Sequence, residues 1–132
     1  MKVVFDTNIF ISAFVIPGSK AEEAYLLALK REFALYSSVA ILTETAQKLR
    51  EKFDWSHGKI THLLKTIAKF ATVINTQPHL HLLADEPDNR VLECTEAANA
   101  DFIVMGDKHL LSLKHFQHSN IVRLSDFLVI LK

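Results

Sequence analysis

The stretch Phe102-Ile103-Val104-Met105-Gly106-Asp107 contains four apolar residues that end at a glycine and an acid. A short apolar run that is closed by a turn signal predicts a β-strand buried on both faces. Lys2-Val3-Val4-Phe5-Asp6, near the other end of the chain, is a second short apolar run that ends at an acid. Strands of this kind are typical of parallel sheets covered by helices on both sides, so the two stretches predict an α/β fold.

Apolar residues recur at helical spacing between these two stretches, which predicts helices that alternate with the strands. Ser19 and Glu22 form a capping-box pattern, Ser37 and Ser38 precede a helix that ends near Phe53, and Ser56 precedes another. Further strands are predicted at 33–36, 72–74 and 121–122. A helix is predicted to begin at Pro87, and a short helix is predicted at 108–113. Ser125 is predicted to cap a C-terminal turn.

The composition predicts one globular domain over residues 1–132, because 49% of the residues are hydrophobic and 23% are charged. The single cysteine, Cys94, excludes an intramolecular disulfide and a cysteine-rich metal cluster. No apolar run reaches the ~18 residues that a membrane span requires, and no signal-peptide pattern is present. We therefore expect a protein of the reducing cytoplasm that does not associate with a membrane.

Basic and acidic residues number fifteen each, which excludes a uniformly basic nucleic-acid-binding surface. The charges are nevertheless segregated along the chain. Residues 48–69 hold six basic and two acidic side chains, whereas residues 84–107 hold seven acidic side chains and Arg90. Both segments could be solvated helix faces, but a basic arm beside an acidic pocket also suits a metal-dependent nuclease.

Four carboxylates are predicted to meet at one edge of the sheet. Asp6 and Asp107 each follow a predicted strand, and the carboxyl ends of parallel strands share one edge. Asp88 opens a helix at that edge, and Glu44 lies early in the helix after the second strand. Clustered carboxylates repel one another unless a cation lies among them, and hard oxygen ligands favour Mg²⁺ or Mn²⁺. Taken singly, each acid could instead be a helix cap, a helix N-terminal acid or a solvent-facing residue.

Three blocks of the sequence together resemble the PIN domain (PilT N-terminal) nuclease family. Asp6-Thr7-Asn8 is similar to the family's opening D-T-N motif. Residues 85–94 resemble the D-x-x-D-N-R-x-L-E-C stretch of a bacterial and archaeal branch, and residues 100–111 resemble its A-D-[YF]-[IL]-V-T-G-D-x-x-L-L block. This branch is described as the toxin component of toxin–antitoxin systems.

The resemblance implies a three-layer α/β/α sandwich with a mostly parallel sheet of about five strands. It also implies an Mg²⁺- or Mn²⁺-dependent ribonuclease that cleaves single-stranded RNA, a small antitoxin partner and a homodimer. Residue by residue, the catalytic and metal-binding acids would be Asp6, Glu44, Asp88 and Asp107, and the supporting residues would be Asn8, Thr7, Ser12 and Asp85. We expect the basic residues Lys48, Arg50, Lys52 and Lys59 to hold the RNA backbone.

Two other functions fit parts of the sequence. Met105 stands where the branch usually has Thr or Ser, which favours a catalytically weak or inactive PIN fold that binds RNA or a protein. An Asp after the first strand also occurs in phosphatases of the haloacid dehalogenase type, but these need a second Asp where this chain has Asn8. Trp55 could stack on a base or pack against other apolar residues, and both interpretations stay open at this point.

Overall fold

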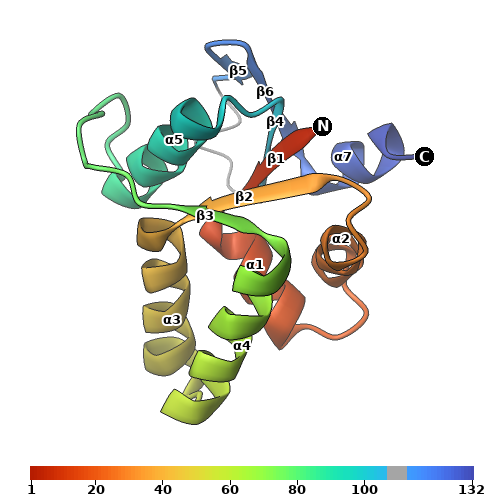
Figure 1. Ribbon diagram of the computed structural model, residues 1–132, viewed down its shortest axis with the longest axis vertical. Coiled ribbons are helices and arrows are strands. Elements are labelled where there is room, and N and C mark those ends of the chain that lie inside the picture. The colour runs from red at the N-terminus through yellow and green to blue at the C-terminus, as the bar shows by residue number, and fades with distance from the viewer. Residues whose placement is uncertain (107–112) are drawn as a thin grey trace.

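The computed structural model describes residues 1–106 and 113–132, which form a sheet with helices on both of its faces (Figure 1). The strands are β1 (Lys2–Phe5), β2 (Ala34–Ser38), β3 (Thr72–Ile74), β4 (Phe102–Met105), β5 (His115–Phe116) and β6 (Ser119–Arg123). Their order in the sheet is β3-β2-β1-β4-β6-β5, and every pair is parallel except β5 with β6. The predicted mostly parallel sheet is confirmed, with six strands where about five were expected.

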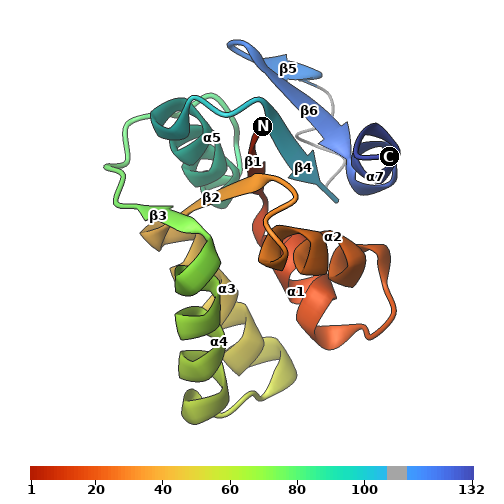
Figure 2. The ribbon, with the colours of Figure 1, turned by 45° about the vertical axis from the view of Figure 1, so that its right-hand side comes forward.

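The helices of the described residues cover both faces of this sheet. They are α1 (Thr7–Val15), α2 (Lys20–Leu29), α3 (Val39–Phe53), α4 (His57–Phe70), α5 (Glu86–Ala98) and α7 (Leu124–Ile130). Helix α5 packs against β1 and β2 on one face, and α1 and α2 lie on the opposite face (Figures 1 and 2). Helices α3 and α4 form a hairpin that extends away from the sheet. The three-layer α/β/α architecture predicted from the sequence is therefore confirmed.

Side-chain caps begin three of these helices where the sequence predicts them. Ser19 accepts a hydrogen bond from the Glu22 N–H at 3.1 Å, and Ser38 and Ser56 cap α3 and α4 in the same way. Each serine satisfies an N–H group that has no partner within its helix. The Asp54 residue that follows α3 adopts a left-handed conformation, with φ of 53°, and this conformation ends the helix.

The core is built on the two central strands, β1 and β4. Their residues Val3, Val4, Ile103 and Val104 are fully buried, as the apolar runs predict. The Phe5 ring makes edge-to-face contacts with the rings of neighbouring helices and loops, at Phe10, Phe33 and Phe127. Aromatic pairs of this geometry add to the stabilisation from burial, so ring packing reinforces the face of β1 that carries Phe5.

The structure differs from the sequence prediction in its C-terminal part. Strand β5 was not predicted, because a two-residue strand is too short to show a period. Helix α7 begins at Leu124, so Ser125 lies inside the helix rather than capping it, and the cap residue is Arg123. Residues 108–112 of the helix predicted at 108–113 lie outside the described part of the chain. No helix of the described residues is long and apolar enough to cross a membrane.

We expect Phe127→Ala to lower the free energy of unfolding by about 3–5 kcal/mol, because it leaves a cavity beside three aromatic rings. Val129→Ala in the same helix should cost less than about 0.5 kcal/mol, because Val129 is 70% exposed. Urea unfolding of the two variants measures the difference. Equal effects would contradict the packing described for α7.

Candidate active site

A small polar pocket of about 40 Å³ lies at the carboxyl end of β1, where α1, α3 and α5 meet. Open parallel sheets bind ligands at this edge, because the loops that follow the strands leave the sheet there. The pocket is lined by Asp6, Thr7, Asn8, Glu44, Lys48, Asp85, Pro87, Asp88 and Val91. Three of the four predicted catalytic acids therefore lie around one pocket, although they are far apart in the sequence.

Asp6 joins the sheet to α1. Its backbone N–H donates to the Val104 carbonyl of β4 at 3.1 Å, which continues the pairing of the two central strands by one residue. Its carboxylate accepts a hydrogen bond from the Ile9 N–H at 3.0 Å and so caps α1. The side chain is only 3% exposed. Asp6 thus caps α1, as one interpretation of the sequence predicts, and it also lines the pocket. The N-terminus of α1 stabilises the negative charge of its carboxylate.

Asp88 reaches the pocket from the first turn of α5. It is 9% exposed, and its N–H donates to the Asp85 carbonyl at 3.1 Å. Asp85 is the cap residue of α5, but its exposed side chain makes no capping hydrogen bond. Pro87 lies in the same turn, as the sequence predicts for a helix start. Both Asp85 and Asp88 line the pocket.

Glu44 reaches the pocket from α3 and has two partners there. Its Oε2 accepts a hydrogen bond from the Thr7 hydroxyl at 3.1 Å, and its Oε1 lies 3.0 Å from the Lys48 ammonium. The sequence analysis assigned Lys48 to the RNA backbone alone and missed this ion pair. The i, i+4 spacing of Glu44 and Lys48 on a helix was the signal that could have found it. Lys48 supplies a positive charge inside an otherwise acidic pocket.

The other residues predicted from the sequence are placed differently. Asn8 and Asp85 line the pocket, with exposed side chains. Ser12 is not among the lining residues, and its backbone carbonyl accepts hydrogen bonds from the Ile16 N–H and, at 3.4 Å, from the Ser19 hydroxyl. Asp107 lies outside the described residues.

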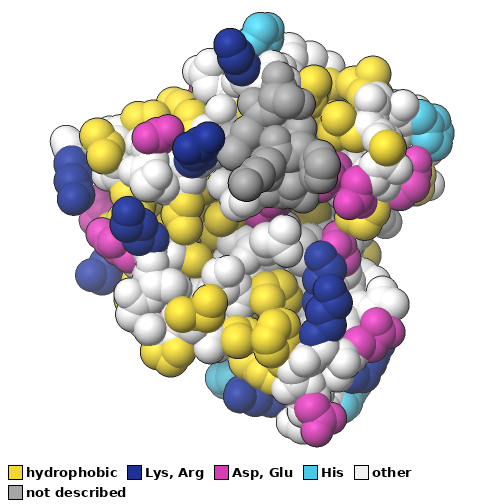
Figure 3. Space-filling model, turned by 180° about the vertical axis from the view of Figure 1, so that it is seen from behind, with side chains coloured by type: hydrophobic (Ala, Val, Ile, Leu, Met, Phe, Trp, Pro, Cys, Tyr) yellow, Lys and Arg dark blue, Asp and Glu magenta, His cyan; other side chains and the backbone are white. Residues whose placement is uncertain are grey.

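Three of the four cations predicted to hold the RNA lie on the surface of the α3–α4 hairpin, outside the pocket lining. Arg50, Lys52 and Lys59 are exposed, on α3 and α4, and do not line the pocket. Figure 3 shows Lys or Arg side chains directly beside Asp or Glu side chains on one face of the molecule. The Lys59 ammonium lies 3.9 Å from the centre of the Trp55 ring, and Trp55 packs against the small apolar cluster between α1, α3 and α4. Of the two interpretations of Trp55, the structure favours packing.

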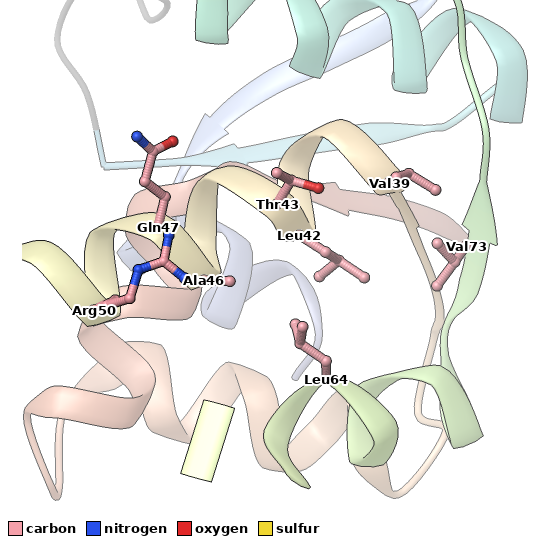
Figure 4. Close-up of a pocket in the computed structure, with 8 residues that line it drawn as sticks. All are labelled: Val39, Leu42, Thr43, Ala46, Gln47, Arg50, Leu64 and Val73. Atoms are coloured by element: carbon pink, nitrogen blue, oxygen red, sulfur yellow. The ribbon is translucent and has the colours of Figure 1, made fainter. Parts of the chain in front are cut away.

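A larger pocket of about 350 Å³ lies between α3, α4 and β3 (Figure 4). Its floor is apolar, and the side chains of Leu42 and Leu64 point toward one another across it. Arg50 is the only titratable residue of its lining, which comprises Val39, Leu42, Thr43, Ala46, Gln47, Arg50, Leu64 and Val73. Because no carboxylate, histidine or cysteine lines it, this pocket is less suited to chemistry than the smaller acidic one.

The donor atoms of the acidic pocket suit a hard divalent cation. Carboxylate oxygens are the ligands that Mg²⁺ and Mn²⁺ prefer, and Asp6 and Asp88 are both buried at this pocket. Within residues 1–106 and 113–132, however, no three His, Cys, Asp or Glu side chains form a group that could hold a metal ion. Glu44 shares its charge with Lys48 instead. The suitability of this pocket for a divalent cation therefore rests on the chemistry of its carboxylate oxygens.

A family model for the PIN domain matches residues 2–109 of the chain. The chain belongs to the PIN domain family. It is also 31% identical, over 119 residues, to the uncharacterized protein MJ1680 of Methanocaldococcus jannaschii, an alignment that covers 86% of this chain and 76% of that protein. The family assignment made from the three sequence blocks is confirmed.

Two solved structures share the architecture of this PIN domain. VapBC2 from Rickettsia felis, bound to a promoter DNA fragment, superposes with a TM-score of 0.66 and 14% identity, over 93% of this chain and 98% of that one. VapC20 from Mycobacterium tuberculosis gives a TM-score of 0.63 and 12% identity, over 89% and 98%. At these identities the likeness concerns the fold.

We expect His79 to titrate above its ordinary pKa of 6.5. The Gln77 carbonyl, 2.8 Å from Nδ1, and the Glu96 carboxylate, 2.9 Å from Nε2, both favour the protonated ring and raise its pKa. While Glu96 is ionised, this pair should therefore stabilise the fold fully below pH 6.5, and the stabilisation should be lost as the pH rises through the folded-state pKa of His79. An NMR titration of His79 measures the midpoint.

Glu96→Gln should lower this midpoint, whereas Asp126→Asn, which changes an exposed acid of α7, should leave it unchanged. A midpoint at or below 6.5 in the unaltered protein would contradict the assigned contacts.

Cys94 should be unreactive toward thiol reagents in the folded PIN domain. It is fully buried on α5, and burial raises the pKa of its thiol to about 12, although a hydrogen bond with Ser38 lowers it slightly. The thiolate is the reactive form, so modification should require unfolding. Labelling with a chromogenic disulfide at pH 8, with and without urea, provides the test. Rapid stoichiometric labelling without urea would show that Cys94 is accessible.

Proposed function

We propose that this PIN domain is a divalent-metal-dependent endoribonuclease that cleaves single-stranded RNA and acts as the toxin of a toxin–antitoxin pair. The observation that carries the proposal is the convergence of Asp6, Glu44 and Asp88 on one polar pocket at the edge of a parallel sheet. Nucleases of the PIN family use divalent metal ions. The two structural neighbours support the toxin role, because one is a VapBC complex and the other is a toxin that cleaves the sarcin–ricin loop.

Asp6, Asp88 and Asp107 would hold the metal, with Glu44 as a further acid of the site. Bound Mg²⁺ or Mn²⁺ would polarise the scissile phosphate and make water more acidic. Asp6 and Asp88 are suited to this role because each comes from the end of a rigid element and is buried at the pocket. Water would attack phosphorus in line with the leaving 3′-oxygen, which yields 5′-phosphate and 3′-hydroxyl ends.

The remaining residues of the pocket would orient the acids and the RNA. The Thr7 hydroxyl holds the Glu44 carboxylate, and Asn8 and Asp85 lie at the exposed rim. Lys48 would contact a phosphate beside the cleaved bond. The exposed cations farther along the hairpin would hold the backbone electrostatically, so binding should weaken as salt rises; these cations are Arg50, Lys52 and Lys59.

The proposal extends to partners and location. A small antitoxin would inhibit the enzyme by covering the acidic pocket, and the chain would act as a homodimer in the cytoplasm. Met105, which favoured a module that binds without cutting, is fully buried in the core, where it extends the apolar β4 strand. A packing role accounts for Met105, so the geometry supports the nuclease better than the binding module.

The test is cleavage of labelled single-stranded RNAs with Mn²⁺, with Mg²⁺ and with EDTA. We expect cleavage that needs a metal ion and that falls by about 100-fold or more in Asp6→Asn and Asp88→Asn, a loss of about 3 kcal/mol of transition-state stabilisation. Asp126→Asn makes the same change at an exposed acid of α7 and should leave the rate unchanged.

Circular dichroism spectra would establish that each variant is folded. Full activity in both Asp6→Asn and Asp88→Asn would refute the assignment. An absence of both cleavage and metal binding in the unaltered protein would favour the binding module.

A further inference from the structure

The segment between β3 and α5 is fastened to α5 by a buried carboxylate. The Glu93 side chain is completely buried, and its Oε2 accepts hydrogen bonds from the backbone N–H groups of His79 at 2.6 Å and Leu80 at 2.8 Å. Its Oε1 lies 2.8 Å from the Arg90 Nε. Burying a carboxylate is costly unless it is paired and hydrogen-bonded. Glu93 forms its ion pair with Arg90 through Oε1 and its hydrogen bonds through Oε2.

Two further residues of α5 hold the same segment. The Arg90 guanidinium also donates to the Leu80 carbonyl at 3.1 Å and lies 3.3 Å from the Glu86 carboxylate. The Asn89 amide binds both backbone groups of Leu83, accepting from its N–H and donating to its carbonyl, each at 2.9 Å. Asn89, Arg90 and Glu93 are called the α5 clamp below. In Figure 1 the clamped segment runs from β3 to the start of α5.

The N-terminus of α5 has no side-chain cap. Asp85, the cap residue of α5, makes no capping hydrogen bond with its side chain, so its carboxylate is not occupied in starting the helix. Asp88 lies in the same turn and reaches the acidic pocket, whereas its neighbour Asn89 holds the incoming segment. The residues that hold the chain before α5 are therefore different from those that line the pocket.

We infer that the α5 clamp positions the acids of the active site. This inference rests on the proposed function. Arg90 and Glu93 are then positioning residues, because they hold residues 79–83 against α5 and thereby fix Asp85 and Asp88 at the pocket. Neither Arg90 nor Glu93 lines the pocket itself. Some residues do not bind a metal themselves but orient the side chains that do. Altering such a residue commonly changes metal affinity or activity by 10- to 100-fold.

The test compares Glu93→Gln with Glu96→Gln. Glu93→Gln keeps the shape and one oxygen acceptor but removes the charge that Arg90 pairs with. Glu96→Gln is the matched control, because Glu96 lies one turn farther along α5 and also contacts His79, but through an exposed side chain. Three measurements are made on each folded variant: amide hydrogen exchange, binding of Mn²⁺ alone by electron paramagnetic resonance, and kcat and KM for RNA cleavage.

We expect Glu93→Gln to speed exchange of the His79 and Leu80 amides by at least about tenfold, because both lose a charged acceptor. Mn²⁺ binding should weaken by about tenfold and kcat should fall by about 10- to 100-fold, with KM within about twofold. Glu96→Gln should change Mn²⁺ binding and kcat by less than about twofold, because exposed ion pairs contribute little.

Faster exchange with unchanged Mn²⁺ affinity and unchanged kcat would overturn the inference, because the clamp would then be structural only. Unchanged exchange would overturn it as well. If Glu93→Gln does not fold, Arg90→Lys replaces it, since a lysine cannot reach both Glu93 and the Leu80 carbonyl as the guanidinium does. If the unaltered protein binds Mn²⁺ but cuts no RNA, the proposed function fails, and exchange and Mn²⁺ binding still decide whether the clamp positions the acids.

Discussion

The parallel pairing of β1 with β4 is the contact on which the rest of the molecule depends. It places Val4 opposite Ile103 and Phe5 opposite Val104, and the Asp6 N–H continues the ladder by one more hydrogen bond to the Val104 carbonyl. Because both strands are buried on both faces, a one-residue shift in register would turn each side chain toward the other face, where its packing partners differ. The pairing therefore fixes where the carboxyl ends of the two strands lie and with them the position of the acidic pocket.

Removing carboxylates from water costs free energy, and nearby donors in the structure offset that cost. Asp6 is stabilised by the α1 N-terminus, Glu44 by Lys48 and Thr7, and Glu93 by Arg90 and two backbone N–H groups. These three carboxylates are thus each matched by a donor from their own or a neighbouring element. Such partners allow acids to remain charged and ordered at low exposure, which is the condition that a site for a hard cation requires.

The two similar solved structures show how little of the sequence the fold needs. The architecture matches VapBC2 and VapC20 at 14% and 12% identity, across nearly the whole of those chains. What the fold demands is apolar strands, capped helices and a buried aromatic centre, and many sequences satisfy these demands. The acidic pocket imposes a stricter demand, because a carboxylate must follow β1 and another must open α5.

The sequence by itself determined the features that depend on neighbouring residues. The apolar runs of β1 and β4, the caps at Ser19, Ser38 and Ser56 and the start of α5 near Pro87 were all predictable, because each follows from a few adjacent side chains. The family and the sheet architecture were also predictable, since the three sequence blocks occur in order between residues 6 and 111. The short antiparallel β5 and the start of α7 were not, because no local period or cap marks them.

Only the tertiary structure decided which side chains meet. The sequence placed Asp6, Glu44 and Asp88 at one edge, but it did not show that Thr7 and Lys48 would take both oxygens of Glu44 or that Ser12 would lie outside the pocket lining. Glu93 looked like any other acid of a charged segment, yet it is completely buried and binds the backbone of His79, fourteen residues earlier in the chain. Contacts of this kind join segments through the packing of α5 on the sheet, and spacing along one chain does not encode them.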